Sequence, residues 1–228
     1  MGYLLLEGGA EFRGQMREPD LKAIALAGGF DAPIRIIPTA AAPDNNHQRA
    51  GNNAINWFQR LGAKDVQSVP LISKIRADDA KLAQTLREAK LIYMLGGFPH
   101  YLGQTLKDSL AWQAVMDAFH NGAVIAGSSA GAMVLCEFYY DPGAKHIHEG
   151  LNVVPNAIVL PHHETFGKSW APLLTKKHPN ATLIAIDEQT GMLNDGENYS
   201  WTIYGRGSVT LYRRNQVETH RTGAVLSL

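Results

Sequence analysis

The sequence has little cysteine and no excess charge of either sign. Cys136 is the single cysteine in 228 residues, which excludes an intrachain disulfide and a zinc site built from several thiolates. The 21 Lys and Arg residues balance the 21 Asp and Glu residues, and no basic run stands out. Because nothing in this composition would attract phosphates, nucleic acid is not an expected partner.

Long hydrophobic runs are absent as well. Nowhere do about 18 uninterrupted apolar residues occur, the length that a transmembrane helix needs. The short apolar run near the N-terminus ends at Glu7, and no basic residue precedes it, unlike the pattern of a secretory signal. We therefore expect a soluble, cytoplasmic protein with no membrane as a partner.

The composition that remains is typical of a chain with a sizeable apolar core. Hydrophobic residues make up 45% of the sequence, together with 22 Gly and 11 Pro, so folding should need neither a disulfide nor a metal. No internal repeat, low-complexity tract or proline-rich linker divides the chain. We expect one domain over residues 1–228.

Short apolar runs alternate with longer segments of helical spacing in the first half. Predicted strands lie at residues 3–6, 34–37, 66–71, 89–95 and 123–126, and predicted helices at 46–61, 78–88 and 101–120. Such alternation is typical of an α/β fold with a mainly parallel sheet sandwiched by helices.

The pattern changes after residue 180. Short runs at 182–186, 191–193, 200–204, 208–212 and 216–220 are separated by turn residues such as Asn194-Asp195-Gly196 and Asn215. This spacing predicts a short antiparallel meander that closes the same domain.

A glycine-rich segment follows the predicted strand at 123–126. In Gly127-Ser128-Ser129-Ala130-Gly131 the spacing G-x-S-x-G centres on Ser129, between a buried strand and the start of a helix, which is the context of a nucleophile elbow. Small residues are needed there because the two arms of a sharp turn pass close together. Ser129, rather than Ser128, is the candidate nucleophile, and a tight turn or a phosphate-binding junction is the alternative.

A double glycine ends the strand before the elbow. Met94-Leu95-Gly96-Gly97-Phe98-Pro99 should lie beside the elbow if the two parallel strands are neighbours. A glycine N–H can approach an anionic oxygen closely, so Gly97 and Ala130 are the predicted oxyanion-hole donors. The alternative for the double glycine is a turn that needs a positive φ.

A serine nucleophile needs a base, and that base needs an orienting acid. His162 and His163 directly follow a predicted strand at 157–160, where strand ends of such sheets carry ligands and catalysis. Asp187 and Glu188 follow the strand at 182–186 and should point in opposite directions. The residues alone separate neither the two histidines nor the two acids, and a solvated turn is the alternative for the acidic pair.

Five segments together resemble the serine peptidases of the dipeptidase E and cyanophycinase family, peptidase family S51. They are LEGGAE at 6–11, LGG at 95–97, GSSAGA at 127–132, PHH at 161–163 and AIDEQT at 185–190. The elbow is similar to the family's G-x-S-A-G-A, and the acidic segment is similar to its G-I-D-E-D-T. The likeness runs from about residue 3 to residue 213.

This resemblance implies a class I glutamine amidotransferase-like, flavodoxin-like fold and a triad in the order serine, histidine, acid. Carried onto this chain, the triad is Ser129, His163 and Glu188. It implies hydrolysis of peptide bonds in small peptides through an acyl-enzyme, by a dipeptidase or another exopeptidase, with no metal and no cofactor. The expected partner is a small peptide substrate, and the sequence leaves a homodimer open.

The sequence departs from the family's pattern at two places. Phe98-Pro99 follows the double glycine where the family usually has Asn or Asp, and His162 stands where the family often has Gln. We expect Phe98, His100 and His162 to contact the substrate, with Phe98, His100 and Tyr101 forming a more apolar pocket wall.

Three other functions fit parts of the sequence. An α/β-hydrolase esterase would pair Asp187 or Asp195 with His220, in the chain order serine, acid, histidine. A zinc hydrolase would use His146, His148, His162 and His163, although no H-E-x-x-H is present. A non-catalytic amidotransferase-like domain would keep the elbow as a small-ligand site.

Overall fold

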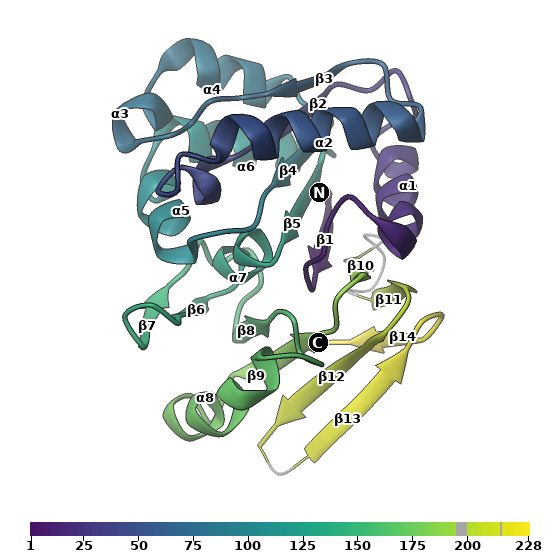
Figure 1. Ribbon diagram of the computed structural model, residues 1–228, viewed down its shortest axis with the longest axis vertical. Coiled ribbons are helices and arrows are strands. Elements are labelled where there is room, and N and C mark those ends of the chain that lie inside the picture. The colour runs from purple at the N-terminus through teal and green to yellow at the C-terminus, as the bar shows by residue number, and fades with distance from the viewer. Residues whose placement is uncertain (195–199, 215) are drawn as a thin grey trace.

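A sheet of eight strands forms the centre of the molecule (Figure 1). The computed structural model describes residues 1–194, 200–214 and 216–228. In spatial order the strands are β14 (Val225–Ser227), β11 (Ser200–Gly205), β10 (Thr190–Asn194), β1 (Tyr3–Glu7), β5 (Val124–Ser128), β4 (Leu91–Met94), β2 (Ile34–Ile37) and β3 (Val66–Ser68). Five neighbouring strands, in the spatial order β1, β5, β4, β2 and β3, run parallel. The predicted parallel core of an α/β fold is therefore confirmed.

A smaller sheet lies below the first in Figure 1. Its strands are β13 (Gln216–Arg221), β12 (Ser208–Arg213), β9 (Thr182–Ile186) and β8 (Ala157–Leu160). Of its pairs, only β8 and β9 are parallel. The predicted C-terminal meander is present, but it is divided: β10, β11 and β14 extend the large sheet, whereas β12 and β13 join β9. Residues 195, 196 and 215 of the predicted turns lie outside the described residues.

Helices cover both faces of the large sheet. They are α1 (Arg17–Leu26), α2 (His47–Leu61), α3 (Lys74–Ala77), α4 (Ala80–Arg87), α5 (Pro99–Leu106), α6 (Leu110–His120), α7 (Ala130–Leu135) and α8 (Ala171–Lys177), with 3-10 turns at Gly14–Met16, Thr39–Ala41 and Gly167–Trp170. Apolar side chains of α1 and α2 pack on one face. Those of α4 to α7 pack on the other, together with the small sheet. A hairpin of β6 (Phe138–Asp141) and β7 (His146–Glu149) follows α7.

The segment predicted as one helix at 101–120 is two helices. Asp108 has a left-handed backbone, with φ of 55°, which ends α5. Ser109 then caps α6, because its Oγ accepts a hydrogen bond from Trp112 N at 3.0 Å. The sequence analysis missed this cap, as it missed α1, α3, α8 and the β6–β7 hairpin. Among the described residues, none of these helices has the length and apolarity needed to cross a bilayer.

Candidate active site

Ser129 occupies a strained turn between β5 and α7. Its φ of 49° and ψ of −110° lie outside the regions that L-residues normally adopt. The flanking glycines have a steric cause: a Cβ on Gly127 would lie 2.5 Å from the carbonyl carbon of Gly131. Ser128 is buried, whereas Ser129 is partly exposed. The turn therefore presents the Ser129 hydroxyl at the edge of the sheet.

His162 and Glu188 continue from this hydroxyl in a line of hydrogen bonds. His162 Nε2 lies 3.1 Å from Ser129 Oγ, and His162 Nδ1 lies 2.8 Å from Glu188 Oε1. Because a carboxylate only accepts hydrogen bonds, Nδ1 carries the ring proton and Nε2 is free to accept from the serine. The two side chains are 18% and 26% exposed, so the line is shielded on most sides but open to a substrate.

The prediction that His163 lies beside Ser129 is wrong. Its Nε2 lies 2.9 Å from Tyr212 Oη, and its Nδ1 lies 3.4 Å from Asp187. His162 has a left-handed backbone, with φ of 51°, so the ring that turns toward the elbow comes one residue earlier than the resemblance implied. Burial lowers the pKa of His163, with the Asp187 charge opposing this effect.

The two acids after β9 point in opposite directions. Glu188 faces His162, whereas Asp187 Oδ2 accepts hydrogen bonds from the backbone N–H and the hydroxyl of Ser208, at 2.9 and 2.7 Å. The structure thus brings Ser129 and Glu188 together as predicted, but through His162. Asp187 and His163 form a second pair turned toward β12.

The end of β1 contacts all three segments of this line. Three consecutive carbonyls accept backbone hydrogen bonds: that of Glu7 from Ser129 at 3.0 Å, that of Gly8 from His162 at 2.8 Å, and that of Gly9 from Gln189 at 3.0 Å. Gln189 is the neighbour of Glu188. The sequence analysis missed this role, although the segment LEGGAE was among the family-like ones.

Further side chains surround the His162–Glu188 pair. The Phe166 ring stacks on the His162 ring, with centroids 4.7 Å apart. Glu188 also has the Arg13 guanidinium 3.6 Å away, and its backbone N–H donates to the Glu164 carboxylate at 2.8 Å. Neither Phe166 nor Arg13 was singled out by the sequence, because only the fold brings them near residue 162 or 188.

The double-glycine loop lies beside the elbow, as the predicted neighbouring strands required. β4 and β5 pair in parallel, with Met94 opposite Gly127. A Cβ on Gly96 would lie 3.3 Å from Ser129 Cβ, and one on Gly97 would lie 2.3 Å from the Ala40 carbonyl oxygen. A side chain at residue 97 would therefore clash with backbone, whereas the Gly96 position is tight against the side chains of Ser129 and Glu11.

The predicted substrate-contacting residues differ in their surroundings. Phe98 is 44% exposed, whereas His100 Nδ1 lies 3.1 Å from Tyr139 Oη. A cavity of about 290 Å³ adjoins Gly97 and Phe98 and is also lined by Glu11, Asp44 and Arg49. The cavity beside the double glycine is therefore more polar than the Phe98-Pro99 departure predicted.

Apart from His162, the histidines that an esterase or a zinc hydrolase would use contact side chains other than Ser129. The His148 ring stacks on that of His100 and meets the His146 ring edge to face, whereas the histidine in contact with the elbow is His162. No group of three or more His, Cys, Asp and Glu side chains that could hold a metal occurs in the described part of the chain. His220 lies on β13, 3.6 Å from Glu218, and Asp195 lies outside the described residues.

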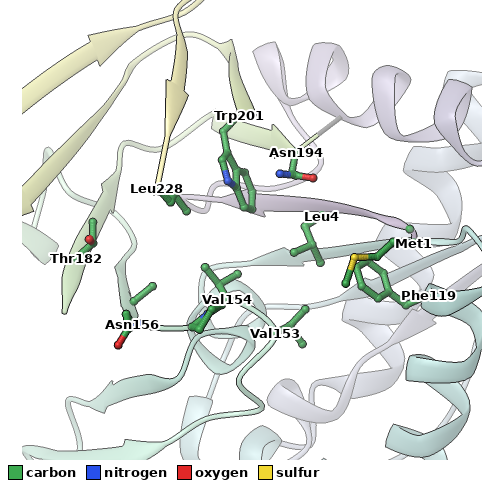
Figure 2. Close-up of a pocket in the computed structure, with 13 residues that line it drawn as sticks. Met1, Leu4, Phe119, Val153, Val154, Asn156, Thr182, Asn194, Trp201 and Leu228 are labelled. Carbon is green, nitrogen blue, oxygen red and sulfur yellow. The ribbon is translucent and has the colours of Figure 1, made fainter. Parts of the chain in front are cut away.

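A second cavity, of about 510 Å³, lies near the starts of β1, β8 and β9, at the opposite end of these strands from the candidate site. Figure 2 shows Leu4, Val154, Phe119 and Trp201 around it. Its lining includes Leu4 near the start of β1, as well as the first residues of β8 and β9. Ser129, His162 and Glu188 instead follow strand ends, so this cavity does not belong to the candidate site.

Comparison with known proteins agrees with the fold. A profile of peptidase family S51 matches residues 4–201. The chain is 28% identical over 220 residues to a cyanophycinase of Geminocystis herdmanii, covering 91% of this chain and 79% of that protein. It is 26% identical over 222 residues to a cyanophycinase of Thermosynechococcus vestitus, covering 92% and 67%.

Solved structures show the same fold. A peptidase from an acI-B1 Actinobacterium superposes with a TM-score of 0.90 at 28% identity, covering 100% of this chain and 97% of that one. A putative peptidase E from Listeria monocytogenes superposes with a TM-score of 0.64 at 18% identity, covering 98% and 100%. The class is therefore that of a peptidase, a hydrolase of the serine type. Because the profile match spans most of its length, the chain belongs to peptidase family S51.

Proposed function

We propose that the chain hydrolyses peptide bonds of small peptides with Ser129, His162 and Glu188 as its catalytic triad. The observation that carries this proposal is the unbroken line of hydrogen bonds from Ser129 Oγ through the His162 ring to Glu188. The strained backbone of Ser129 supports it, because strain of this kind clusters at active sites.

In the proposed reaction, Ser129 Oγ attacks the scissile carbonyl carbon while His162 Nε2 accepts the hydroxyl proton. Glu188 accepts from Nδ1–H and stabilises the imidazolium that forms. His162 then gives the proton to the leaving amine as the C–N bond breaks, which leaves an acyl ester on Ser129. A water molecule, deprotonated by His162, hydrolyses this ester and restores the serine.

We assign the oxyanion hole to the backbone N–H groups of Gly97 and Ala130. Support comes from the pairing of β4 with β5, which brings the double glycine and the elbow together. Each donor of such a hole contributes roughly 3 kcal/mol to transition-state stabilisation in well-studied hydrolases. The cavity that adjoins Gly97 would then receive a substrate side chain, and its mixed charges from Glu11, Asp44 and Arg49 favour a polar one.

The test compares Ser129→Ala with Ser128→Ala. The Ser128 hydroxyl is buried without a hydrogen-bond partner in the described structure, so its removal should leave activity within about twofold. Removal of the Ser129 hydroxyl should lower kcat by about 10⁴ or more. Hydrolysis would be measured on dipeptides with acidic, basic and apolar first residues, on blocked amides and on cyanophycin.

Labelling by a fluorophosphonate gives a second measurement, because it requires an activated serine but no particular peptide. Wild-type protein should be labelled on Ser129, as read by mass spectrometry of the modified peptide. Protein that neither reacts with the probe nor cleaves any peptide would contradict the proposal and favour a small-ligand-binding domain.

A further inference from the structure

The side chain of Glu7 lies beneath the candidate active site and takes no part in the triad. Glu7 is the last residue of β1 and is fully buried. Strand alternation places it on the same face as Leu5, which packs with α1 and α2. Its Oε2 accepts a hydrogen bond from Tyr93 Oη on β4. A carboxyl group therefore sits inside an otherwise apolar layer.

Asp20 of α1 is the second carboxyl group in this layer, and it too is fully buried. Its Oδ2 accepts a hydrogen bond from Trp57 Nε1 at 2.7 Å. The carboxyl groups of Glu7 and Asp20 lie close enough for each to act on the pKa of the other. Their other oxygens, Glu7 Oε1 and Asp20 Oδ1, have no donor among the described residues. Because ionised carboxylates only accept, at least one of the two groups must carry a proton.

The surroundings favour this protonated state. The rings of Phe12, Trp57, Phe58 and Tyr93 pack against one another in the same layer. The other titratable groups that act on the pair are Tyr93 on β4 and Glu11 after β1, and Glu11 adds a further negative charge.

Burial raises the pKa of both groups. For Glu7, burial and then the Asp20 charge raise the pKa well above its ordinary value. Burial raises the pKa of Asp20 to about 7, against the lowering effect of the hydrogen bond from Trp57. Two interacting buried carboxylates, with no cation from the described residues acting on them, would cost far more than a shared proton.

We propose that Glu7 and Asp20 are positioning residues for the triad, an inference that rests on the proposed function. The proton between their carboxyl groups fixes the end of β1 against α1. The three carbonyls of residues 7, 8 and 9 then hold the backbones of Ser129, His162 and Gln189 at the distances given above. When the last proton leaves the pair, repulsion between the two carboxylates moves the end of β1. The hydrogen bonds from Ser129 through His162 to Glu188 then lose their geometry.

The first test is the pH dependence of fluorophosphonate labelling of Ser129. In wild-type protein the labelling rate should fall at least fivefold at alkaline pH, as the carboxyl pair loses its last proton. Glu7→Gln/Asp20→Asn keeps the shapes and supplies amide donors without a titratable group. This double variant should lack the alkaline fall. A role in stability alone would lower the melting temperature but leave the shape of the profile unchanged.

The second test needs no activity and no variant of the pair. The indole N–H of Trp57 donates to Asp20, so its NMR signal, assigned with Trp57→Phe, reports the protonation of the pair. The His162 ring signals should change in step with the Trp57 signal, in wild-type protein and in Ser129→Ala alike. This readout remains available if the double variant does not fold.

The outcomes separate the two proposals. Absence of labelling at every pH would contradict the triad, whereas the NMR coupling between residues 57 and 162 would still decide the role of the pair. The positioning role is overturned if the alkaline fall in labelling rate persists in the double variant. It is also overturned if the His162 signals do not change when the Trp57 signal reports the titration of the carboxyl pair. A Trp57 signal that is constant from pH 5 to 9.5 would overturn it as well.

Discussion

At the scale of single residues, the site consists of two adjacent histidine–acid pairs with different tasks. His162 and Glu188 face Ser129, while His163 and Asp187 face Tyr212 and Ser208. The pairs diverge because consecutive residues at each strand end point to opposite sides. One pair serves the proposed chemistry, and the other joins the segments after β8 and β9 to β12.

Replacement of each histidine separately distinguishes these tasks. His162→Ala should lower kcat by about 10³ or more, because Ser129 loses the base that accepts its proton. His163→Ala should leave kcat within about threefold and lower the melting temperature, since it removes the buried hydrogen bond to Tyr212. Peptide hydrolysis and calorimetry on both variants give the comparison. Full activity in His162→Ala, or its loss in His163→Ala, would reverse the assignment.

The sequence could identify the candidate nucleophile but not the histidine beside it. Ser129 is marked by glycines whose spacing has a steric cause at the turn. His162 and His163 follow the same strand, and the choice between them depends on the positive φ of His162. A positive φ is rare in residues other than glycine, and nothing in the letters PHH signals it. The resemblance, in which His162 stands where the family often has Gln, therefore favoured the wrong histidine.

At the scale of elements, the turn after β1 is built around the His162 ring. Gly9 has a φ of 111°, and a Cβ there would lie 2.3 Å from His162 Cε1 and 2.6 Å from Nε2. No flexible end of a side chain takes up this clash, because the ring is held between Ser129 and Glu188. A methyl group at residue 9 must therefore displace the base itself.

Gly9→Ala should lower kcat at least 100-fold, and Gly28→Ala is the matched control. Gly28 has a similar φ of 106°, but a Cβ there would have no neighbour within 4 Å. Both variants should lose about 1 kcal/mol of stability through the unfavourable backbone conformation. Only Gly9→Ala should lose activity. Equal kcat values in the two variants would show that the space around His162 tolerates the methyl group.

The local sequence pattern predicted where the strands lie better than it predicted which strands pair with each other. Buried runs such as 123–126 and 157–160 were found because they are apolar throughout. Their distribution between two sheets was missed, because 200–204 and 208–212 carry the same short-strand pattern although β11 and β12 join different sheets. Strand pairing of this kind is decided by tertiary packing, which a local pattern does not contain.

At the scale of the whole molecule, the site depends on both sheets. Ser129 follows β5 of the large sheet, whereas His162 and Glu188 follow β8 and β9 of the small one. The end of β1 joins the three segments through its backbone carbonyls. Under the positioning role proposed above, global stability and the geometry of the site both depend on the buried carboxyl groups of Glu7 and Asp20.

This buried pair predicts how global stability changes with pH. The pKa of Asp20 is raised in the folded protein to about 7 from an ordinary value of 3.8, so folding favours the protonated form. Its contribution is complete below about pH 4 and is lost as the pH rises through 7. Between pH 5 and 8 the wild-type protein should lose about 3 kcal/mol relative to Glu7→Gln/Asp20→Asn, or roughly 5 to 10 °C in melting temperature.

Asp79 provides a control of the opposite sign. Backbone hydrogen bonds from Leu82 and Lys81 at the start of α4 lower the pKa of this partly exposed side chain. It stays ionised from pH 5 to 8 in the folded and the unfolded chain, so Asp79→Asn should change the melting temperature by the same amount at every pH in that range. Calorimetry of the three proteins in matched buffers gives the comparison. If the melting temperature of wild-type protein changed with pH in parallel with that of the double variant, the folded protein would carry no more protons on the pair at pH 5 than the unfolded chain.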